Sequence, residues 1–266
     1  MLRIGYICPT YNAQGLDGYT RLALLSFFET TPHGVAIVVD DGSASWTPEY
    51  QQTLQDIADN YANGAIHFHH FPQAGGLTRS WNRGLQIADE LGLDYAIAGN
   101  NDVIFTWLWY EGLIHALAND YSLVGPLSNA PGITAKNGKQ EVQKHLPSFE
   151  LTDDRDKLDA MASKLHEAHL GEVIESPVNG FFQMAKMSDW KRGMFDSNHF
   201  YRPKNTHTSR GRRNPTPFMT LNEDELQGRW GRKGMQSAIV LSSFIFHYRA
   251  VSRGEKYKRG DWYRQK

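Results

Sequence analysis

The sequence predicts an α/β protein with a mostly parallel central sheet covered by helices on both faces. Strand-like and helix-like segments alternate through the first 125 residues. The strand-like segments are apolar throughout, as in 35–39 (VAIVV), which is typical of strands buried on both faces. Polar clusters follow three of these segments, at the carboxyl ends where such sheets bind ligands.

The elements of the first half follow from local patterns. We predict strands at 2–8, 35–39, 65–71 and 95–98, and helices at 17–29, 47–61 and 77–91. Thr47 followed by Pro48 is a typical helix start, and Gly92 suits the end of the third helix.

The second half is less regular. We predict loops at 125–150 and at the basic segment 200–217, helices at 153–169 and 222–233, and strands at 181–187 and 236–246. His247 ends the last strand, and no linker divides the chain. We therefore expect one domain over 1–266, with a nucleotide-binding half (1–125) and an acceptor-binding half (126–266).

Composition excludes several classes of protein. The chain has 28 Lys and Arg against 29 Asp and Glu, which argues against a protein that binds nucleic acid along a basic face. Its single cysteine, Cys8, excludes a disulfide framework. No basic leader precedes a long apolar run, and segment 238–246 is too short to span a bilayer. We expect a cytoplasmic protein without a transmembrane segment.

Three residues at the predicted strand ends have chemistry suited to a metal and a nucleotide. Asp102 and His247 can hold Mg²⁺ or Mn²⁺ together with a polyphosphate, although a turn former and a structural histidine would explain them equally. Asp41 can accept a hydrogen bond from a base imide, or can end its strand in an Asx turn.

Two helix starts carry further candidates. Gly75 and Gly76 open a helix that contains Arg79, and such a start can receive a phosphate. Segment 222–225 (NEDE) places carboxylates in the first turn of another helix, where they either cap it or supply a general base.

The ordered set of these motifs resembles glycosyltransferase family 2, the inverting nucleotide-sugar enzymes of the GT-A fold. Segments 8–12 (CPTYN), 38–43 (VVDDGS), 75–84 (GGLTRSWNRG) and 100–102 (NND) are similar to its nucleotide-binding motifs. Segments 178–182 (VNGFF), 193–196 (GMFD), 222–226 (NEDEL) and 247–254 are similar to its later ones. The resemblance implies a Rossmann-like GT-A sheet with an acceptor-side C-terminal half.

The resemblance also implies the site. It assigns the nucleotide-sugar to Pro9, Thr10, Tyr11, Asn12, Asp41, Gly76, Arg79, Asn82 and Asn101. It assigns the divalent metal, Mn²⁺ or Mg²⁺, to Asp102 and His247, and the acceptor to Gly180 and Phe181. The implied donors are UDP-, GDP- or dTDP-linked sugars, and the implied acceptor is a carbohydrate or other hydroxyl.

Two points stay open at the level of sequence. The spacing to Arg229 places Glu223 at the catalytic base position, whereas the Glu-Asp pair places Asp224 there, and Asp224 is preferred. Asn101 stands where the family carries a metal-binding Asp, which keeps a catalytically degenerate carbohydrate- or nucleotide-binding module as an alternative. A sugar-phosphate nucleotidyltransferase is the other alternative, weakened by the absence of Lys or Arg between Pro9 and Gly18.

Overall fold

The computed structural model describes residues 2–11, 17–61, 64–130, 145–146, 152–196 and 222–248, and it confirms the α/β architecture. Its strands are β1 (Ile4–Thr10), β2 (Val35–Asp40), β3 (Ala65–His70), β4 (Tyr95–Gly99), β5 (Val103–Phe105), β6 (Tyr121–Leu127), β7 (Val173–Glu175), β8 (Phe182–Lys186) and β9 (Gln236–His247). Its helices are α1 (Asp17–Thr30), α2 (Pro48–Asp59), α3 (Leu77–Glu90), α4 (Glu111–Ala118), α6 (Arg155–His169), α7 (Met187–Trp190) and α8 (Asn222–Gly231).

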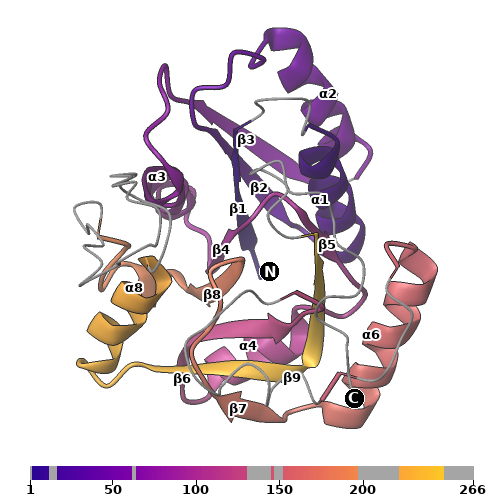
Figure 1. Ribbon diagram of the computed structural model, residues 1–266, viewed down its shortest axis with the longest axis vertical. Coiled ribbons are helices and arrows are strands. Elements are labelled where there is room, and N and C mark those ends of the chain that lie inside the picture. The colour runs from indigo at the N-terminus through magenta and orange to yellow at the C-terminus, as the bar shows by residue number, and fades with distance from the viewer. Residues whose placement is uncertain are drawn as a thin grey trace, which may run out of the picture.

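One sheet runs through both halves of the chain, in the order β3-β2-β1-β4-β8-β6-β9-β5, with β7 paired to β9 (Figure 1). The first four strands in this order are parallel. β8 then enters between β4 and β6 and runs antiparallel to both. The sheet therefore joins the segments around residues 100, 180 and 247, which are far apart in sequence.

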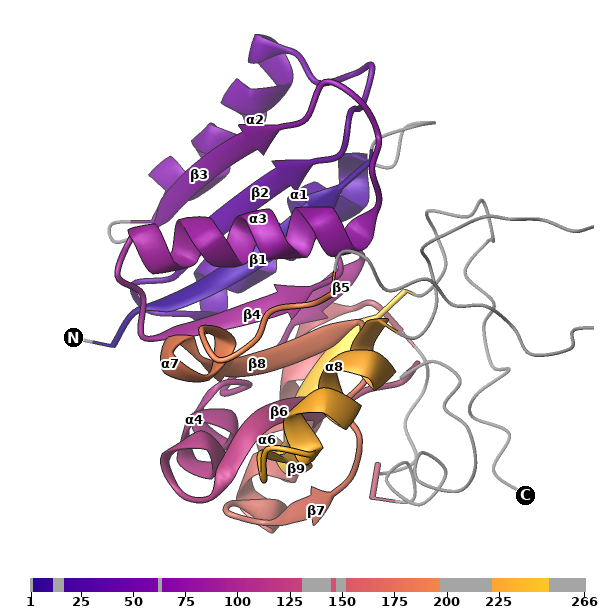
Figure 2. The same cartoon turned by 90° about the vertical axis from the view of Figure 1, so that its left-hand side faces the viewer.

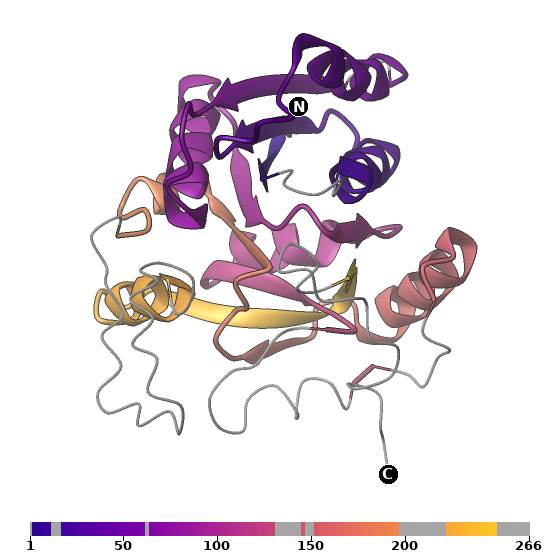
Figure 3. The same cartoon turned by 45° about the horizontal axis from the view of Figure 1, so that its top comes forward.

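Helices cover both faces of the sheet, as the apolar strands predict. Figure 2 shows α3 crossing in front of β1 and β2, with α1 and α2 behind them, and Figure 3 shows the same separation from above. Within β1, Ile7 belongs to the core that includes Trp81 and Leu85 of α3. Tyr6 belongs to the other core, with Phe27 of α1. The alternation of side chains along the strand sends each to a different layer.

Local sequence accounts for several element boundaries. Thr47 caps α2, because its side chain accepts a hydrogen bond of 3.2 Å from the backbone N–H of Tyr50, and Pro48 is the first helical residue. Gly92 lies one residue past Leu91, the C-cap of α3, with φ of +65°, a conformation that glycine adopts without strain.

The prediction of a loop over 125–150 was wrong at its start. Gly125 and Pro126 lie in β6, where they pair with Ile239 and Val240 of β9. The register between β6 and β9 shifts immediately after Pro126, so this proline stands at an irregularity of the ladder. Strands β5 and β7 and helices α4 and α7 were also not predicted.

Some sequence-based expectations fall outside the described residues, namely the basic loop 200–217 and most of 128–150. Among the described helices, none is both long enough and apolar enough to cross a membrane.

Candidate active site

The parallel strands β1, β2 and β4 end at one edge of the sheet, as predicted, and ligand binding at this edge stays a prediction. Thr10, at the end of β1, is in register with Asp40, at the end of β2. The backbone N–H of Asp41 then donates to the carbonyl of Thr10 at 2.9 Å. β4 runs parallel to β1, so its end at Gly99 delivers the turn 100–102 to the same edge.

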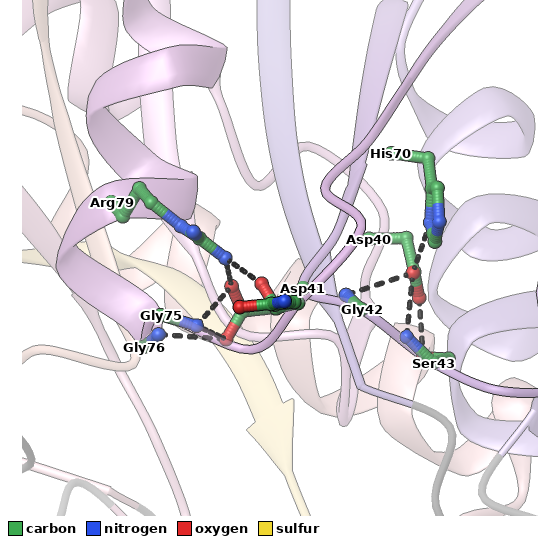
Figure 4. A network of polar contacts seen from close by, with 9 residues as sticks. Asp40, Asp41, Gly42, Ser43, His70, Gly75, Gly76 and Arg79 are labelled. Carbon is green, nitrogen blue, oxygen red and sulfur yellow. Dashed lines mark hydrogen bonds and ion pairs between the residues drawn. The ribbon is translucent and has the colours of Figure 1, made fainter.

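The two consecutive aspartates at the end of β2, Asp40 and Asp41, have different partners, as Figure 4 shows. Asp40 is fully buried and turns back into its own loop. Its carboxylate accepts from the backbone N–H groups of Gly42 (3.1 Å) and Ser43 (2.9 Å), from the Ser43 hydroxyl and from His70 Nδ1 (2.8 Å). This is the structural Asx turn that the sequence analysis weighed for this motif.

Asp41 reaches the start of α3 instead (Figure 4). Its carboxylate accepts from the backbone N–H groups of Gly75 (3.0 Å) and Gly76 (2.7 Å) and from the Arg79 guanidinium (2.5 Å). The guanidinium carbon Cζ of Arg79 lies over the Phe71 ring, 3.8 Å from its centroid. The helix start that was predicted to receive a phosphate therefore holds the protein's own carboxylate, which complements the positive end of the helix dipole. The contact of Arg79 with phosphate stays a prediction.

Buried aromatic side chains fasten the turn that follows β4. Trp81 Nε1 donates to the carbonyl of Gly99 at 2.8 Å, and the Tyr6 hydroxyl donates to the carbonyl of Asn100. The backbone N–H of Asn100 donates to the carbonyl of Phe181 at 2.8 Å. Burial raises the pKa of Tyr6 well above its usual value, and the negative charge of the nearby Asp102 contributes to this rise. The phenol therefore keeps its proton and remains a donor.

Asp102 and His247 meet at this edge, which brings together the two predicted metal ligands. His247 Nε2 lies 3.3 Å from Asp102 Oδ1, and both side chains are buried. His247 Nδ1 lies 2.7 Å from the carbonyl of Ala130, which only accepts, so Nδ1 carries a proton. In the neutral ring, the lone pair of Nε2 then faces Asp102 Oδ1 and the side-chain amide of Asn100, whose Nδ2 lies 3.4 Å away.

This donor set fits a divalent cation. Two cis ligands at about 2.1 Å from a metal would lie about 3.0 Å apart, close to the 3.3 Å between Nε2 and Oδ1. The hydrogen bond from Nδ1 to a carbonyl is the outer contact that metal-binding histidines make. Among the described residues, no group of three or more His, Cys, Asp or Glu could hold a metal, so Asp102 and His247 are a pair of candidate ligands there and not a complete set.

The three carboxylates at the start of α8 have three different environments. Asp224 is exposed. Glu225 is bound to Arg229, at 2.8 Å and 3.1 Å, and these bonds raise the pKa of the guanidinium. Glu223 is partly buried and lies over Gly180. A Cβ added to Gly180 would lie 3.0 Å from Cδ of Glu223. Glu223 is thus the carboxylate next to the predicted acceptor segment.

Phe181 lies between Glu223 and the two predicted metal ligands, Asp102 and His247. It follows Gly180, and its ring stacks on the His247 imidazole with centroids 4.7 Å apart and an interplanar angle of 13°. Glu223, Gly180, Phe181 and His247 thus form a continuous series of contacts between α8 and β9.

The remaining predicted donor-binding residues surround the same edge. Pro9 and Thr10 end β1, and the ring of Tyr11 is 48% exposed directly after them. Asn101 Nδ2 donates to Thr20 Oγ1 at 2.9 Å, which directs this side chain toward α1. Asn82 Nδ2 donates to the carbonyl of Phe195 at 2.8 Å. Asn12 lies outside the described residues.

Sequence reasoning missed the residues that support the site rather than form it. Tyr6 and Trp81 were not singled out within their predicted strand and helix, and Asn129 and Ala130 lie in the segment that was predicted to be a loop. No local pattern distinguishes them, because each acts on a backbone group distant in sequence, such as that of His247, 118 residues from Asn129.

No protein-family model and no curated protein sequence matches the chain. The similarity to solved structures lies in the fold. The chain is similar to a mannosyltransferase from Pyrobaculum calidifontis in complex with GDP-Man and Mn²⁺, at 13% identity and a TM-score of 0.56, covering 92% of this chain and 56% of that one. It is similar to GalNAc-T7 with UDP, GalNAc and Mn²⁺, at 14% identity and a TM-score of 0.58, covering 93% and 44%.

A third similar structure is S. aureus TarS, residues 1–349, at 14% identity and a TM-score of 0.52, covering 93% of this chain and 60% of that one. The chain thus spans about half the length of the solved structures that it matches. The fold is that of GT-A glycosyltransferases, as the sequence resemblance implied.

Proposed function

We propose that this protein is an inverting glycosyltransferase that moves a sugar from a nucleoside-diphospho-sugar to an acceptor hydroxyl with the help of a divalent metal. One observation carries the proposal. Asp102 and His247, which suit a metal, are linked to the carboxylate of Glu223 by contacts of the Gly180–Phe181 segment. The GT-A neighbours in complex with GDP-Man or with UDP support a nucleotide at this edge of the sheet.

Each residue has a distinct task in the proposed reaction. Glu223 takes the proton from the acceptor hydroxyl while the oxygen of that hydroxyl forms a bond to the anomeric carbon of the sugar. The bond from this carbon to the diphosphate breaks on the opposite side, so a single displacement inverts the configuration. Asp102 and His247 hold the metal, Mn²⁺ or Mg²⁺, which when bound stabilises the charge of the leaving diphosphate.

The nucleotide would lie along the end of β1 and the loop after β2. The exposed ring of Tyr11 offers a surface on which a base stacks, and Asp41, Gly76 and Arg79 lie at the start of α3. Pro9, Thr10, Asn82 and Asn101 complete the proposed nucleotide-sugar site, and Gly180 and Phe181 the acceptor site. UDP-, GDP- and dTDP-linked sugars are the candidate donors, and a cytoplasmic location accompanies the proposal.

Ligand binding and donor turnover test the proposal together. The protein is heated with UDP, GDP, dTDP or CMP, with and without Mn²⁺, and the melting temperature is recorded. A nucleotide at 100 times its Kd adds about 2.7 kcal/mol to the free energy of unfolding. We expect one nucleoside diphosphate to stabilise the protein only with Mn²⁺, and its sugar conjugates to release that diphosphate slowly.

The Asp102→Asn variant serves as the matched control, since it keeps the shape of the side chain but loses its charge. Stabilisation by no nucleotide would refute the proposal. Binding without any turnover of sugar conjugates would favour a catalytically degenerate binding module instead.

A further inference from the structure

The side-chain amide of Asn129 makes two hydrogen bonds to the backbone of His247. Its Nδ2 donates to the carbonyl of His247 at 3.0 Å, and its Oδ1 accepts from the backbone N–H of His247 at 2.8 Å. Asn129 is 2% exposed, so both bonds lie in the interior. This reciprocal pair resembles the one that two residues exchange across an antiparallel ladder, but here a side chain makes it.

The pairing of the strands explains why the backbone of His247 needs these two hydrogen bonds. β6 ends at Leu127, which is in register with Phe244, so the described β6 ladder leaves His247 without a main-chain partner. On its other edge, β9 pairs with β5, and the backbone N–H of Tyr248 donates to the carbonyl of Asp102 at 2.9 Å. Without Asn129, a buried N–H and a buried C=O of His247 would lose these partners, which is costly in a protein interior.

The segment that holds the backbone of His247 also orients its ring. The carbonyl of Ala130 accepts from Nδ1 at 2.7 Å. The ring of Phe181 stacks on the imidazole. The position of the backbone, the tautomer and the plane of the ring are thus determined together, and they leave Nε2 beside Asp102.

We infer that Asn129 is a positioning residue, which sets the His247 imidazole for a divalent cation by holding the backbone of His247. The part that concerns the metal rests on the proposed function. The side chain of residue Asn129 must be an amide of this length, because the two hydrogen bonds to His247 need one donor and one acceptor. Aspartate would set an oxygen against the carbonyl of His247, and leucine would leave both backbone groups unpaired.

Three variants of Asn129 test the inference: Asn129→Asp, Asn129→Leu and the milder Asn129→Ser, whose side chain is too short to reach both groups. The matched control is Thr106→Val. The Thr106 hydroxyl is buried and donates to the carbonyl of Phe244 at 2.6 Å, so it also bonds the backbone of β9 close to His247. All four substitutions should lower the melting temperature.

The first readout needs no metal. Long-range ¹H–¹⁵N spectra of the full chain report which nitrogen of the His247 ring carries the proton. We expect the Nδ1–H form in the parent and in Thr106→Val, and a mixture of forms in the Asn129 variants. The second readout is the Kd for Mn²⁺ alone, followed by the paramagnetic resonance signal of the free ion. Loss of an outer-shell partner should raise this Kd about 10- to 100-fold.

Each result decides a separate claim. Folded Asn129 variants with the ring signal and the Mn²⁺ affinity of the parent would overturn the inference. Equal changes in Thr106→Val would reduce Asn129 to a general stabiliser and overturn it as well. A parent protein that binds no Mn²⁺ would count against the proposed function, while the ring spectra would still decide whether Asn129 holds His247.

Discussion

The three consecutive carboxylates of α8 allow a sharp test of catalysis, because they share a helix turn and differ in surroundings. We expect Glu223→Gln to lower the rate of donor turnover about 10²- to 10⁴-fold, the usual effect of removing a general base. This corresponds to about 2.7–5.4 kcal/mol of lost transition-state stabilisation. Glutamine keeps the shape of the side chain over Gly180, so donor binding and folding should change little.

The two neighbours of Glu223 are matched controls. Asp224 is exposed, so Asp224→Asn should change turnover less than twofold and stability by no more than about 0.3–1 kcal/mol, the usual size of a first-turn charge effect. Glu225→Gln weakens the two bonds to Arg229, which are partly buried. It should lower the free energy of unfolding by up to about 1 kcal/mol and have a small effect on rate.

The assay follows release of nucleoside diphosphate from a nucleotide-sugar, with water as the acceptor where no better one is known. Melting temperature and donor affinity are measured on the same samples. Near-parent turnover in Glu223→Gln would refute the assignment of the base. A large loss confined to Asp224→Asn would instead support Asp224 as the base, which was preferred in the sequence analysis.

Four further predictions concern the rest of the site and the core. Asp102→Ala should abolish transfer and raise the Kd for Mn²⁺, measured by calorimetry, at least tenfold; unchanged Mn²⁺ affinity would exclude a metal role. Asp41→Ala should weaken nucleoside diphosphate affinity by about 1–3 kcal/mol more than it changes inorganic diphosphate affinity, because the predicted contact of Asp41 is with the imide of the base; equal changes would restrict Asp41 to holding the Gly75–Gly76 turn. Cys8 should not react with a disulfide reagent in the folded protein at pH 8, because burial raises its pKa from 9.0 to about 12. Between about pH 9 and 12 the unfolded thiol is ionised and the folded one is not, so the free energy of unfolding should fall by up to about 1.4 kcal/mol per pH unit as the pH rises through this window; rapid labelling of the folded protein at pH 8 would contradict the prediction. The side-chain amide of Gln183 is buried and has no hydrogen-bond partner among the described residues, so Gln183→Leu should raise the free energy of unfolding in urea by about 1–2 kcal/mol; a decrease would show that its polar atoms are used.

Local sequence was enough to predict the parallel part of the sheet. The predicted strand at 35–39 became β2 (Val35–Asp40) and the predicted helix at 77–91 became α3 (Leu77–Glu90). The strand is an uninterrupted β-branched and apolar run, and the helix ends before Gly92, which has a positive φ of +65°. β5 is only three residues long, and β6 contains a glycine and a proline that locally favour a loop. Their pairing with β9 outweighs this local tendency.

The residues of the candidate site could be predicted from the sequence, but most of their contacts could not. Strand ends were sufficient to bring Asp102 and His247 to one edge, where they meet. The environment of Glu223 depends on Gly180, which a different part of the chain supplies, so the choice between Glu223 and Asp224 could not come from a local pattern. The same is true of Asp41, whose oxygens bond to the start of α3, 34 and more residues later.

The late position of β8 and β9 in the chain has a consequence for biosynthesis. During translation β1 to β4 emerge early and can pair with one another, but the edge of β4 that lies opposite β1 waits for β8. An exposed strand edge invites pairing with other chains. Nascent chains that stop between β6 and β8 should therefore aggregate and engage chaperones. His247 is the last residue of β9, so the metal-suited pair assembles only after the whole sheet has left the ribosome.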